Sequence, residues 1–309
     1  METEDTNRIV VGVDGTEGSD GALRYAVEQA RERECGLRLV HVGPRYEVMT
    51  SVLPYIPQQV EAAGLAILDE ARQHVVGLSS GLEVETDLRD GARISELVDA
   101  ATTGELLVLG RKSHTGVVTG LFGATTAAVV AGTTVPVAVV PDTWHRSADP
   151  GPVVVGLRGT EHAEGLLEAA FEHAVQHSVG VDVAHAWQIP IPYAHRLETD
   201  DHANKWLPAG VEMVEQTLTP WRNRYPEVPV TVRVVYAQPS LALLTSAKAA
   251  SLLVLQQRPG PKLRGPHLGK TSRSVIAAAP CPVLILPTSA DEHHPKLDLE
   301  LERAGTLLR

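Results

Sequence analysis

The chain has 309 residues, a formal net charge of -11 at pH 7 and 43% hydrophobic residues. This length suffices for about two domains that each bury a core, and the negative charge argues against binding to a nucleic-acid backbone. No stretch approaches the roughly 20 consecutive apolar residues of a membrane-spanning helix, and the start METEDTNR lacks the regions of a signal peptide, so we expect a cytoplasmic protein with no membrane partner.

Short apolar runs alternate with longer amphipathic stretches through the first half of the chain. The spacing predicts strands at 8–14, 37–42, 82–88, 105–110 and 136–140, with helices between them at 19–34, 58–77, 93–103 and 123–132. Continuous apolar runs are typical of parallel strands covered on both faces. Five strands joined by four crossover helices predict a doubly wound α/β sheet of flavodoxin-like order, with its switch point most simply between the first and fourth strands.

The fourth predicted strand is followed by a glycine-containing loop, GRKSHTGVVTGLFGATTAAVV, which begins at Gly110. A glycine at the end of a buried strand and another at a helix start let backbone amides converge on phosphate oxygens. We expect Gly123 to open the helix. The free amides of its first turn then belong to Ala124, Thr125 and Thr126. The loop faces Asp14 across the predicted switch point.

Two segments depart from the strand and helix pattern. PDTWHRSADPGP, from Pro141, predicts a short ordered linker. Insertions at 43–58 and 188–208 are rich in proline and aromatic residues. We expect them over the edge of the sheet, either as partly ordered surface loops or as partner-binding segments.

The second half of the chain repeats the first. VVGVDGTEGSDGALRYA from Val10 matches VVGLRGTEHAEGLLEAA from Val154, and LLVLG from Leu106 matches LLVLQ from Leu252. We therefore predict two tandem domains of five strands each, at 1–143 and 150–288, followed by a charged tail at 289–309.

The opening VGVDGT, the pair His41 and Val42, the glycine loop and the closing VPVAVVP strand resemble the universal stress protein family, in its tandem form typical of actinobacteria. The resemblance covers nearly the whole chain, twice. It implies an adenine nucleotide alpha hydrolase-like strand order. It also implies that the last strands of the two copies pair in an internal pseudo-dimer, which protects edges that would otherwise promote aggregation.

The nucleotide-binding branch of that family has a glycine, two residues, a second glycine, nine residues, then glycine followed by serine or threonine. The corresponding residues here are Gly110, Ser113, Gly123 and Ala124, so the spacing is kept while Ser113 and Ala124 depart from the pattern. The resemblance implies ATP as ligand, with Mg²⁺ bound through the nucleotide. It implies Asp14 near the nucleoside, Val42 beside the adenine, Leu109 and Gly110 under the ribose, and Gly123 to Thr126 around the phosphates.

The residues alone also allow simpler interpretations. Asp14 can be a solvated turn residue that caps the next helix, and Lys112 and His114 can be surface charges rather than phosphate contacts. His41 recurs as His185, which favours a structural or surface role for both. Cys35 and Cys281 flank apolar runs and are expected to be buried free thiols.

The second copy lacks most of the nucleotide pattern. Arg158 replaces Asp14, Gln256 replaces Gly110, Pro259 replaces Ser113 and Ala186 replaces Val42, whereas Gly269 matches Gly123. GPHLGKTS from Gly265 resembles a P-loop but has three residues between its glycines where four are needed, and the strand before it ends too early. Lys270 and Arg158 could still form a basic pocket for another anion.

Three functions remain open from the sequence. The first is a stress-response regulator in which ATP changes how the chain meets a protein partner, with any hydrolysis slow and incidental. The second is a scaffold that binds no nucleotide. The third is an ATP-using enzyme, for which we find no HxGH-type signature and no general base beside a nucleophile, so we expect no enzyme. A homodimer of whole chains also remains open.

Overall fold

The computed structural model describes residues 7–44, 56–112, 124–160, 163–188, 199–257 and 268–288, without the side chains of 56–57 and 199–206. The predicted tail at 289–309 lies outside these ranges. The first half contains β1 (Arg8–Gly12), a short 3-10 turn η1 (Glu17–Ser19), α1 (Asp20–Glu32), β2 (Gly36–Gly43), α2 (Ile56–Leu78), β3 (Val84–Asp90), α3 (Arg93–Ala101), β4 (Leu106–Arg111), α4 (Ala124–Gly132) and β5 (Val137–Pro141). Every element predicted for this half is present, and no bound differs from the prediction by more than two residues.

The second half repeats this succession of strands and helices. It contains β6 (Val153–Gly156), α5 (Ala163–His177), β7 (Val181–Trp187), α7 (Thr199–Arg224), β8 (Val230–Tyr236), α8 (Pro239–Ser246), a 3-10 turn η2 (Ala247–Ala249), β9 (Leu252–Gln256), α9 (Lys270–Ala278) and β10 (Val283–Leu286). No helix in the described parts of the chain combines the length and the apolar character needed to cross a bilayer.

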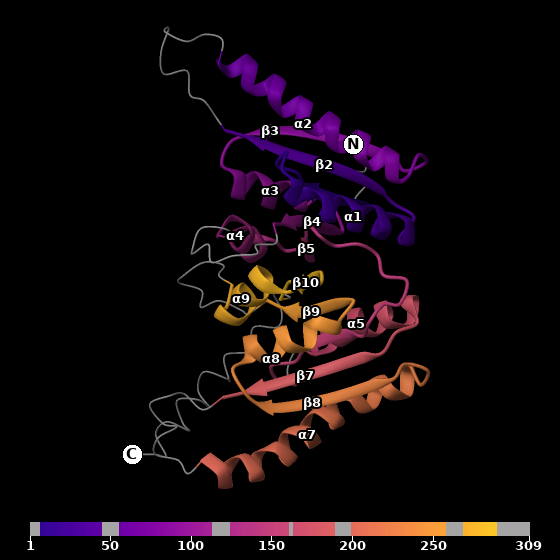
Figure 1. Ribbon diagram of the computed structural model, residues 1–309, viewed down its shortest axis with the longest axis vertical. Helices are drawn as coiled ribbons and strands as arrows, with labels where there is room; N and C mark the ends of the chain where they lie inside the picture. Colours follow the sequence, from indigo (N-terminus) through magenta and orange to yellow (C-terminus); the bar gives the residue numbers. More distant parts are fainter. Residues whose placement is uncertain are drawn as a thin grey trace.

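All ten strands form one sheet, in the order β3-β2-β1-β4-β5-β10-β9-β6-β7-β8 (Figure 1). The switch point of the first half lies between β1 and β4, as predicted. In flavodoxin order, 2-1-3-4-5, the third strand would pair with the first, whereas here β3 pairs with β2 at the edge. The sequence VETDLRD fits an edge, because its polar residues leave much of the strand exposed to solvent.

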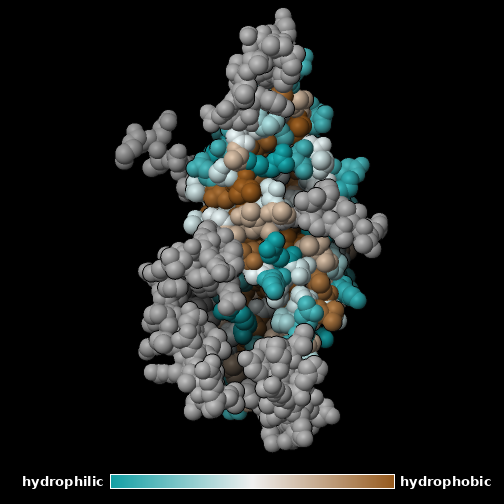
Figure 2. Space-filling model, turned by 90° about the vertical axis from the view of Figure 1, so that its left-hand side faces the viewer, coloured by the Kyte–Doolittle hydropathy of each residue, from teal (hydrophilic) through white to brown (hydrophobic). Residues whose placement is uncertain are grey.

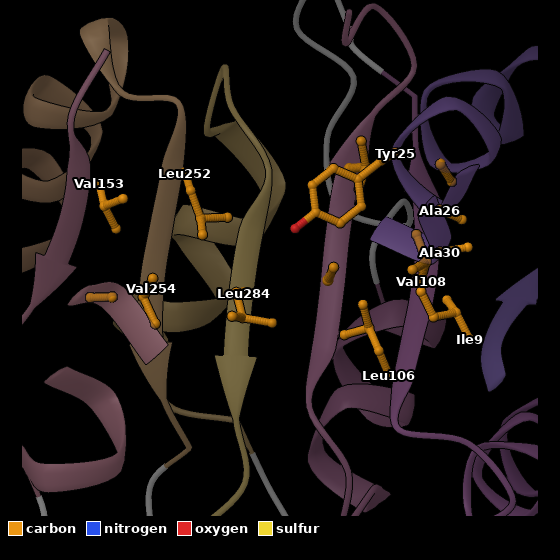
Figure 3. Packing of buried hydrophobic residues seen from close by; sticks show 14 of the residues in the cluster. Ile9, Tyr25, Ala26, Ala30, Leu106, Val108, Val153, Leu252, Val254 and Leu284 are labelled. Atoms are coloured by element: carbon orange, nitrogen blue, oxygen red, sulfur yellow. The ribbon is translucent and has the colours of Figure 1, made fainter. Parts of the chain in front are cut away.

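The two halves meet where β5 pairs with β10, the antiparallel pair of this otherwise parallel sheet. Val283 lies opposite Val139 and Leu284 lies opposite Ala138. Figure 3 shows that buried side chains of the two halves flank this junction and belong to one hydrophobic cluster. The predicted internal pseudo-dimer is therefore confirmed, and neither closing strand presents a free edge.

Two polar side chains at repeat-equivalent positions also join the halves. Arg111 Nη1 donates a hydrogen bond to the carbonyl oxygen of Ala277 at 3.1 Å, and its Nη2 donates to that of Ala279. Gln257 Nε2 donates to the carbonyl oxygens of Val130 and Thr133. Each side chain therefore satisfies carbonyls at the end of the last crossover helix in the other half, where helices leave acceptors unpaired.

The segment that joins the halves is ordered, as predicted, because it packs on α1. The ring of Trp144 meets Tyr25 edge-on, with ring centroids 5.2 Å apart. Arg24 Nη1 donates to the carbonyl oxygens of Asp142 at 3.2 Å and Trp144 at 2.9 Å. These contacts fix the path of the chain between β5 and β6.

The insertion predicted as a loop at 188–208 is in part helical, because α7 begins at Thr199 and continues to Arg224. Pro208 and Pro220 lie inside this helix, although proline removes a backbone donor there. Packing compensates, since Val214 and Leu218 are fully buried. Residues 45–55 and 189–198 of the two insertions lie outside the described ranges.

Cys35 and Cys281 are buried free thiols, as predicted. Burial raises the pKa of Cys281 to about 12, and the pKa of Cys35 is raised by the same cause. Both groups are therefore protonated at neutral pH and serve the core as small apolar side chains.

Candidate functional site

The candidate site lies at the carboxyl edge of the first half, where β1 and β4 diverge into different crossovers. Ligands of doubly wound sheets bind outside the carboxyl ends of the strands at this switch point. Asp14 follows β1, Val42 lies near the end of β2, and Gly110 lies near the end of β4. The α4 helix begins at this same edge, because a crossover helix in a parallel sheet starts where the preceding strand ends.

Asp14 is held by the turn that precedes α1. Its Oδ1 accepts hydrogen bonds from the backbone nitrogen of Thr16 at 3.0 Å, from Thr16 Oγ1 at 2.7 Å and from Ser19 Oγ at 3.1 Å. Burial alone would raise the pKa of Asp14, but the hydrogen bonds from Thr16 and Ser19 lower it below its usual value. The side chain is exposed and ionised, and no hydrogen bond from the described residues reaches Oδ2.

Replacing Asp14 by alanine should lower the free energy of unfolding by about 1 kcal/mol at pH 7, because Thr16 and Ser19 lose their acceptor. The folded-state pKa lies below that of the unfolded chain. The contribution of the carboxylate is therefore complete above the unfolded pKa and is lost as the pH falls through the folded one. Urea titrations of both proteins should give a constant difference from pH 7 to 5 that shrinks below about pH 4. A difference that persists unchanged to pH 3 would show that ionised Asp14 is not its source.

Val42 and Leu109 are core residues, with 5% and 6% of their surfaces exposed. They belong to the hydrophobic cluster beneath α3 and α4, which also contains Leu97 and Val129. A Cβ placed on Gly12 would lie 2.8 Å from Cδ2 of Leu109, so this glycine leaves room for the leucine. Core packing alone accounts for both side chains, and they underlie the edge at which a ligand would lie.

Gly110 has a packing requirement that the sequence does not reveal. A Cβ at this position would overlap the carbonyl oxygen of Gly18 and lie 3.1 Å from Cα of Ser19. The end of β4 therefore closes directly against the turn that carries Ser19, the partner of Asp14. Gly110 thus positions the Asp14 turn, whether or not a ribose lies over it.

The remaining predicted residues lie at the start of α4 and in the loop before it. Ala124 and Thr125 are exposed and Thr126 is half-buried in the first turn of α4, whose amides have no helical partner. Ser113, His114 and Gly123 lie outside the described residues.

Lys112 behaves as a surface charge at this edge. Its Nζ lies 4.0 Å from a carboxylate oxygen of Glu17, and half of its side chain is exposed. The ion pair joins the end of β4 to the same turn that Gly110 contacts. This arrangement agrees with the simpler of the two interpretations of Lys112.

Sequence reasoning missed Thr16, Ser19 and Arg93. Thr16 and Ser19 orient Asp14, and the charge of Arg93 favours its ionised form. The DGT triplet carried a usable signal, because an aspartate often accepts a hydrogen bond from the backbone two residues on. The sequence around Arg93 gave no signal of its approach to Asp14, since the two residues are 79 positions apart in the chain.

The second half keeps the structural contacts of the first half but has different residues at the candidate site. His41 Nδ1 donates to the carbonyl oxygen of Val13 at 2.8 Å, and His185 Nδ1 donates to that of Leu157 at 3.0 Å. The two histidines therefore share one structural role, as predicted. Arg158 and Gln256 stand where the first half has Asp14 and Gly110. Gly269 is the N-cap of α9, and a Cβ added there would meet no atom of the described residues within 4 Å.

On its described surface, the side of the molecule in Figure 2 presents small hydrophobic and hydrophilic patches.

Comparisons with known proteins identify the family of the two halves. Residues 6–141 and 151–287 each match the universal stress protein family. A universal stress protein of Mycolicibacterium smegmatis is 31% identical over 90% of this chain and 96% of its own length. The crystal structure of a universal stress protein from Archaeoglobus fulgidus has a TM-score of 0.66 and 18% identity, over 92% of this chain and 100% of that one. A further structure, of the universal stress protein from Archaeoglobus fulgidus in complex with dAMP, is 22% identical, with a TM-score of 0.33, over 43% of this chain and 97% of that one. This chain belongs to the universal stress protein family, as a tandem of two family domains.

Proposed function

We propose that the chain is a stress-response regulator that binds ATP in its first half and not in its second. The observation that carries the proposal is the asymmetry of the repeat. The first half alone combines the nucleotide-binding spacing of Gly110, Ser113, Gly123 and Ala124 with an ionised aspartate at the switch point. In this proposal the amides of Gly123 to Thr126 bind the phosphates, and Asp14 receives hydroxyl groups of the nucleoside on Oδ2.

The proposal assigns Mg²⁺ to the nucleotide. Among the described residues, the group of carboxylates and histidines that could hold a metal ion lies elsewhere, at Glu28, Glu32 and His177. Asp14 alone supplies too few oxygen ligands for an ion that keeps an octahedral shell. The proposed ion is therefore held by the phosphates of the nucleotide and keeps several of its waters.

We propose that hydrolysis of ATP at this site is at most slow and incidental. The relatives are named as stress proteins. The Asp14 carboxylate accepts hydrogen bonds from Thr16 and Ser19, which gives it a structural role in its turn. The proposed output is a nucleotide-dependent change in the Asp14 turn and the start of α4 that alters binding to a protein partner in the cytoplasm. Association of two chains would add to, and not replace, the β5–β10 junction.

A scaffold that binds no nucleotide is the second candidate. It is favoured by Ser113 and Ala124, which depart from the family pattern. It is also favoured by Gly110, because contact with Gly18 explains that glycine without a ligand. The two candidates differ in whether ATP stabilises the folded chain.

Matched substitutions at the two helix starts test the site. Gly123→Glu should abolish stabilisation by Mg-ATP, since it adds a side chain and a negative charge where the phosphates would bind. Gly269→Glu makes the same change in the second half, where a Cβ meets no described residue within 4 Å, and should leave stabilisation intact. Ligand at 100 times its dissociation constant adds about 2.7 kcal/mol, which thermal unfolding detects.

The effect of Mg-ATP on these proteins distinguishes the ATP-binding regulator from the scaffold. An unaltered protein that gains no stability from Mg-ATP would favour the scaffold. Stabilisation that survives Gly123→Glu and disappears in Gly269→Glu would move the site to the second half.

A further inference from the structure

A cluster of two carboxylates and one imidazole bridges the two halves, on the face of the sheet opposite α3 and α4. Glu28 and Glu32 are one turn apart on α1, and His177 is in the last turn of α5. One potential ligand atom from each side chain lies within 4.8 Å of the others. Figure 1 shows α1 and α5 on the same side of the sheet, on either side of the β5–β10 junction. The cluster therefore depends on how the halves dock, and neither half contains it alone.

His177 is oriented into this cluster with an unsatisfied nitrogen. Its Nε2 is buried and makes no hydrogen bond with the described residues, and the nearest carboxylate oxygen, Oε1 of Glu32, is 3.5 Å away. The other oxygen of Glu32 accepts a hydrogen bond of 2.6 Å from Nε2 of buried Gln29, which fixes the carboxylate. A buried imidazole nitrogen without a partner is costly unless a ligand satisfies it.

The charges of Arg146, Arg33 and Arg31 act on the two carboxylates of the cluster. Burial raises the pKa of both Glu28 and Glu32, although Arg146 lies 3.0 Å from Glu28. The Arg146 side chain is 67% exposed, whereas that of Glu28 is 13% exposed, so Arg146 can leave only when another cation takes its place beside Glu28. His173, whose ring centroid is 4.0 Å from that of His177, adds no positive charge at neutral pH, because burial lowers its pKa to about 3.

We propose that Glu28, Glu32 and His177 bind a zinc-type divalent ion that links the two halves of the chain. Zinc takes imidazole nitrogen and carboxylate oxygen at about 2.0–2.2 Å, which places tetrahedral ligands about 3.4 Å apart. His177 Nε2 and Glu32 Oε1 already have this separation. Glu28 completes three protein ligands by a small side-chain movement that exchanges Arg146 for the ion, and water takes the fourth position.

The donor set defines the class of ion. Ca²⁺ and Mg²⁺ favour oxygen ligands alone, whereas an imidazole with two carboxylates suits zinc and its neighbours in the first transition row. The repeat does not duplicate the site. The positions equivalent to Glu28, Glu32 and His177 are Glu172, Gln176 and Arg33, so we infer one ion per chain.

Titration of the chelator-stripped full chain with ZnCl₂, followed by calorimetry and thermal unfolding, tests this site. We expect one zinc ion per chain, a higher unfolding temperature and no comparable effect of CaCl₂. His177→Gln and Glu32→Gln should each weaken zinc binding about tenfold or more. Glu172→Gln makes the same change on an exposed residue at the repeat-equivalent of Glu28, and should bind zinc as the unaltered chain does.

The variants also separate the site from other histidines. Zinc binding of equal affinity in His177→Gln, Glu32→Gln and the unaltered chain would overturn the proposal, as would a stripped chain that binds no zinc. Arg146→Gln removes the competing cation and should bind zinc at least as tightly, so loss of binding there would also contradict the assignment. Far-ultraviolet circular dichroism with chelator present verifies that each variant is folded.

Discussion

Gly110→Ala should lower the free energy of unfolding by about 3 kcal/mol and weaken nucleotide binding, because a Cβ at this position overlaps the backbone of Gly18. The backbone of Gly18 cannot shift away from the new Cβ without moving its neighbours. The neighbouring Ser19 donates to Asp14, so the turn and the carboxylate must move together. Urea unfolding measures the first effect, and calorimetry with Mg-ATP measures the second.

Gly77 provides the matched control for this substitution. It lies in α2, and a Cβ there meets no atom within 4 Å among the residues that the structure describes. Gly77→Ala should raise stability by about 0.5–1 kcal/mol, since alanine is the better helix former. Equal stability of Gly110→Ala and the unaltered protein would show that β4 does not close against the Asp14 turn.

Arg111→Ala should cost about 2–4 kcal/mol, because it removes a charged donor and leaves two carbonyl groups near the end of α9 without it. Burial lowers the pKa of Arg111, yet the guanidinium remains charged at neutral pH and complements the negative end of the helix dipole. The loss should appear as a lower urea midpoint for the whole chain, since these contacts join the two halves.

The adjacent Lys112 serves as the control for Arg111. Half of its side chain is exposed and its ion pair with Glu17 spans 4.0 Å, so Lys112→Ala should change stability by no more than about 0.5 kcal/mol. Similar losses in the two variants would mean that the contacts of Arg111 across the junction add nothing to stability.

The sequence predicts the strands and helices of the first half closely, because apolar residues form continuous runs in the strands and recur at helical spacing in the helices. The fully buried run at 9–11 in β1 contrasts with α1, whose buried residues recur at helical spacing. The same reasoning was weaker for strand order, which depends on pairing between distant segments. The polar residues of β3 suit an edge, but only the register with β2 establishes its position there.

Prediction of the candidate site was limited by contacts between residues far apart in the chain. Asp14 follows from its position after β1, and its bond to Thr16 is local. Gly110 and Gly18 meet only because β4 returns beside β1. Arg111 reaches a carbonyl 166 positions away, and the approach of His177 to Glu32 likewise depends on the docking of the two halves, for which a single sequence has no local signal.

Calorimetric titration of the nucleotide-stripped protein with Mg-ATP tests the central claim most directly, because it reports affinity and stoichiometry together. Our account predicts saturation near one site per chain, with the first half occupied and the second empty. Two equivalent sites, or no heat and no thermal stabilisation at millimolar Mg-ATP, would contradict it.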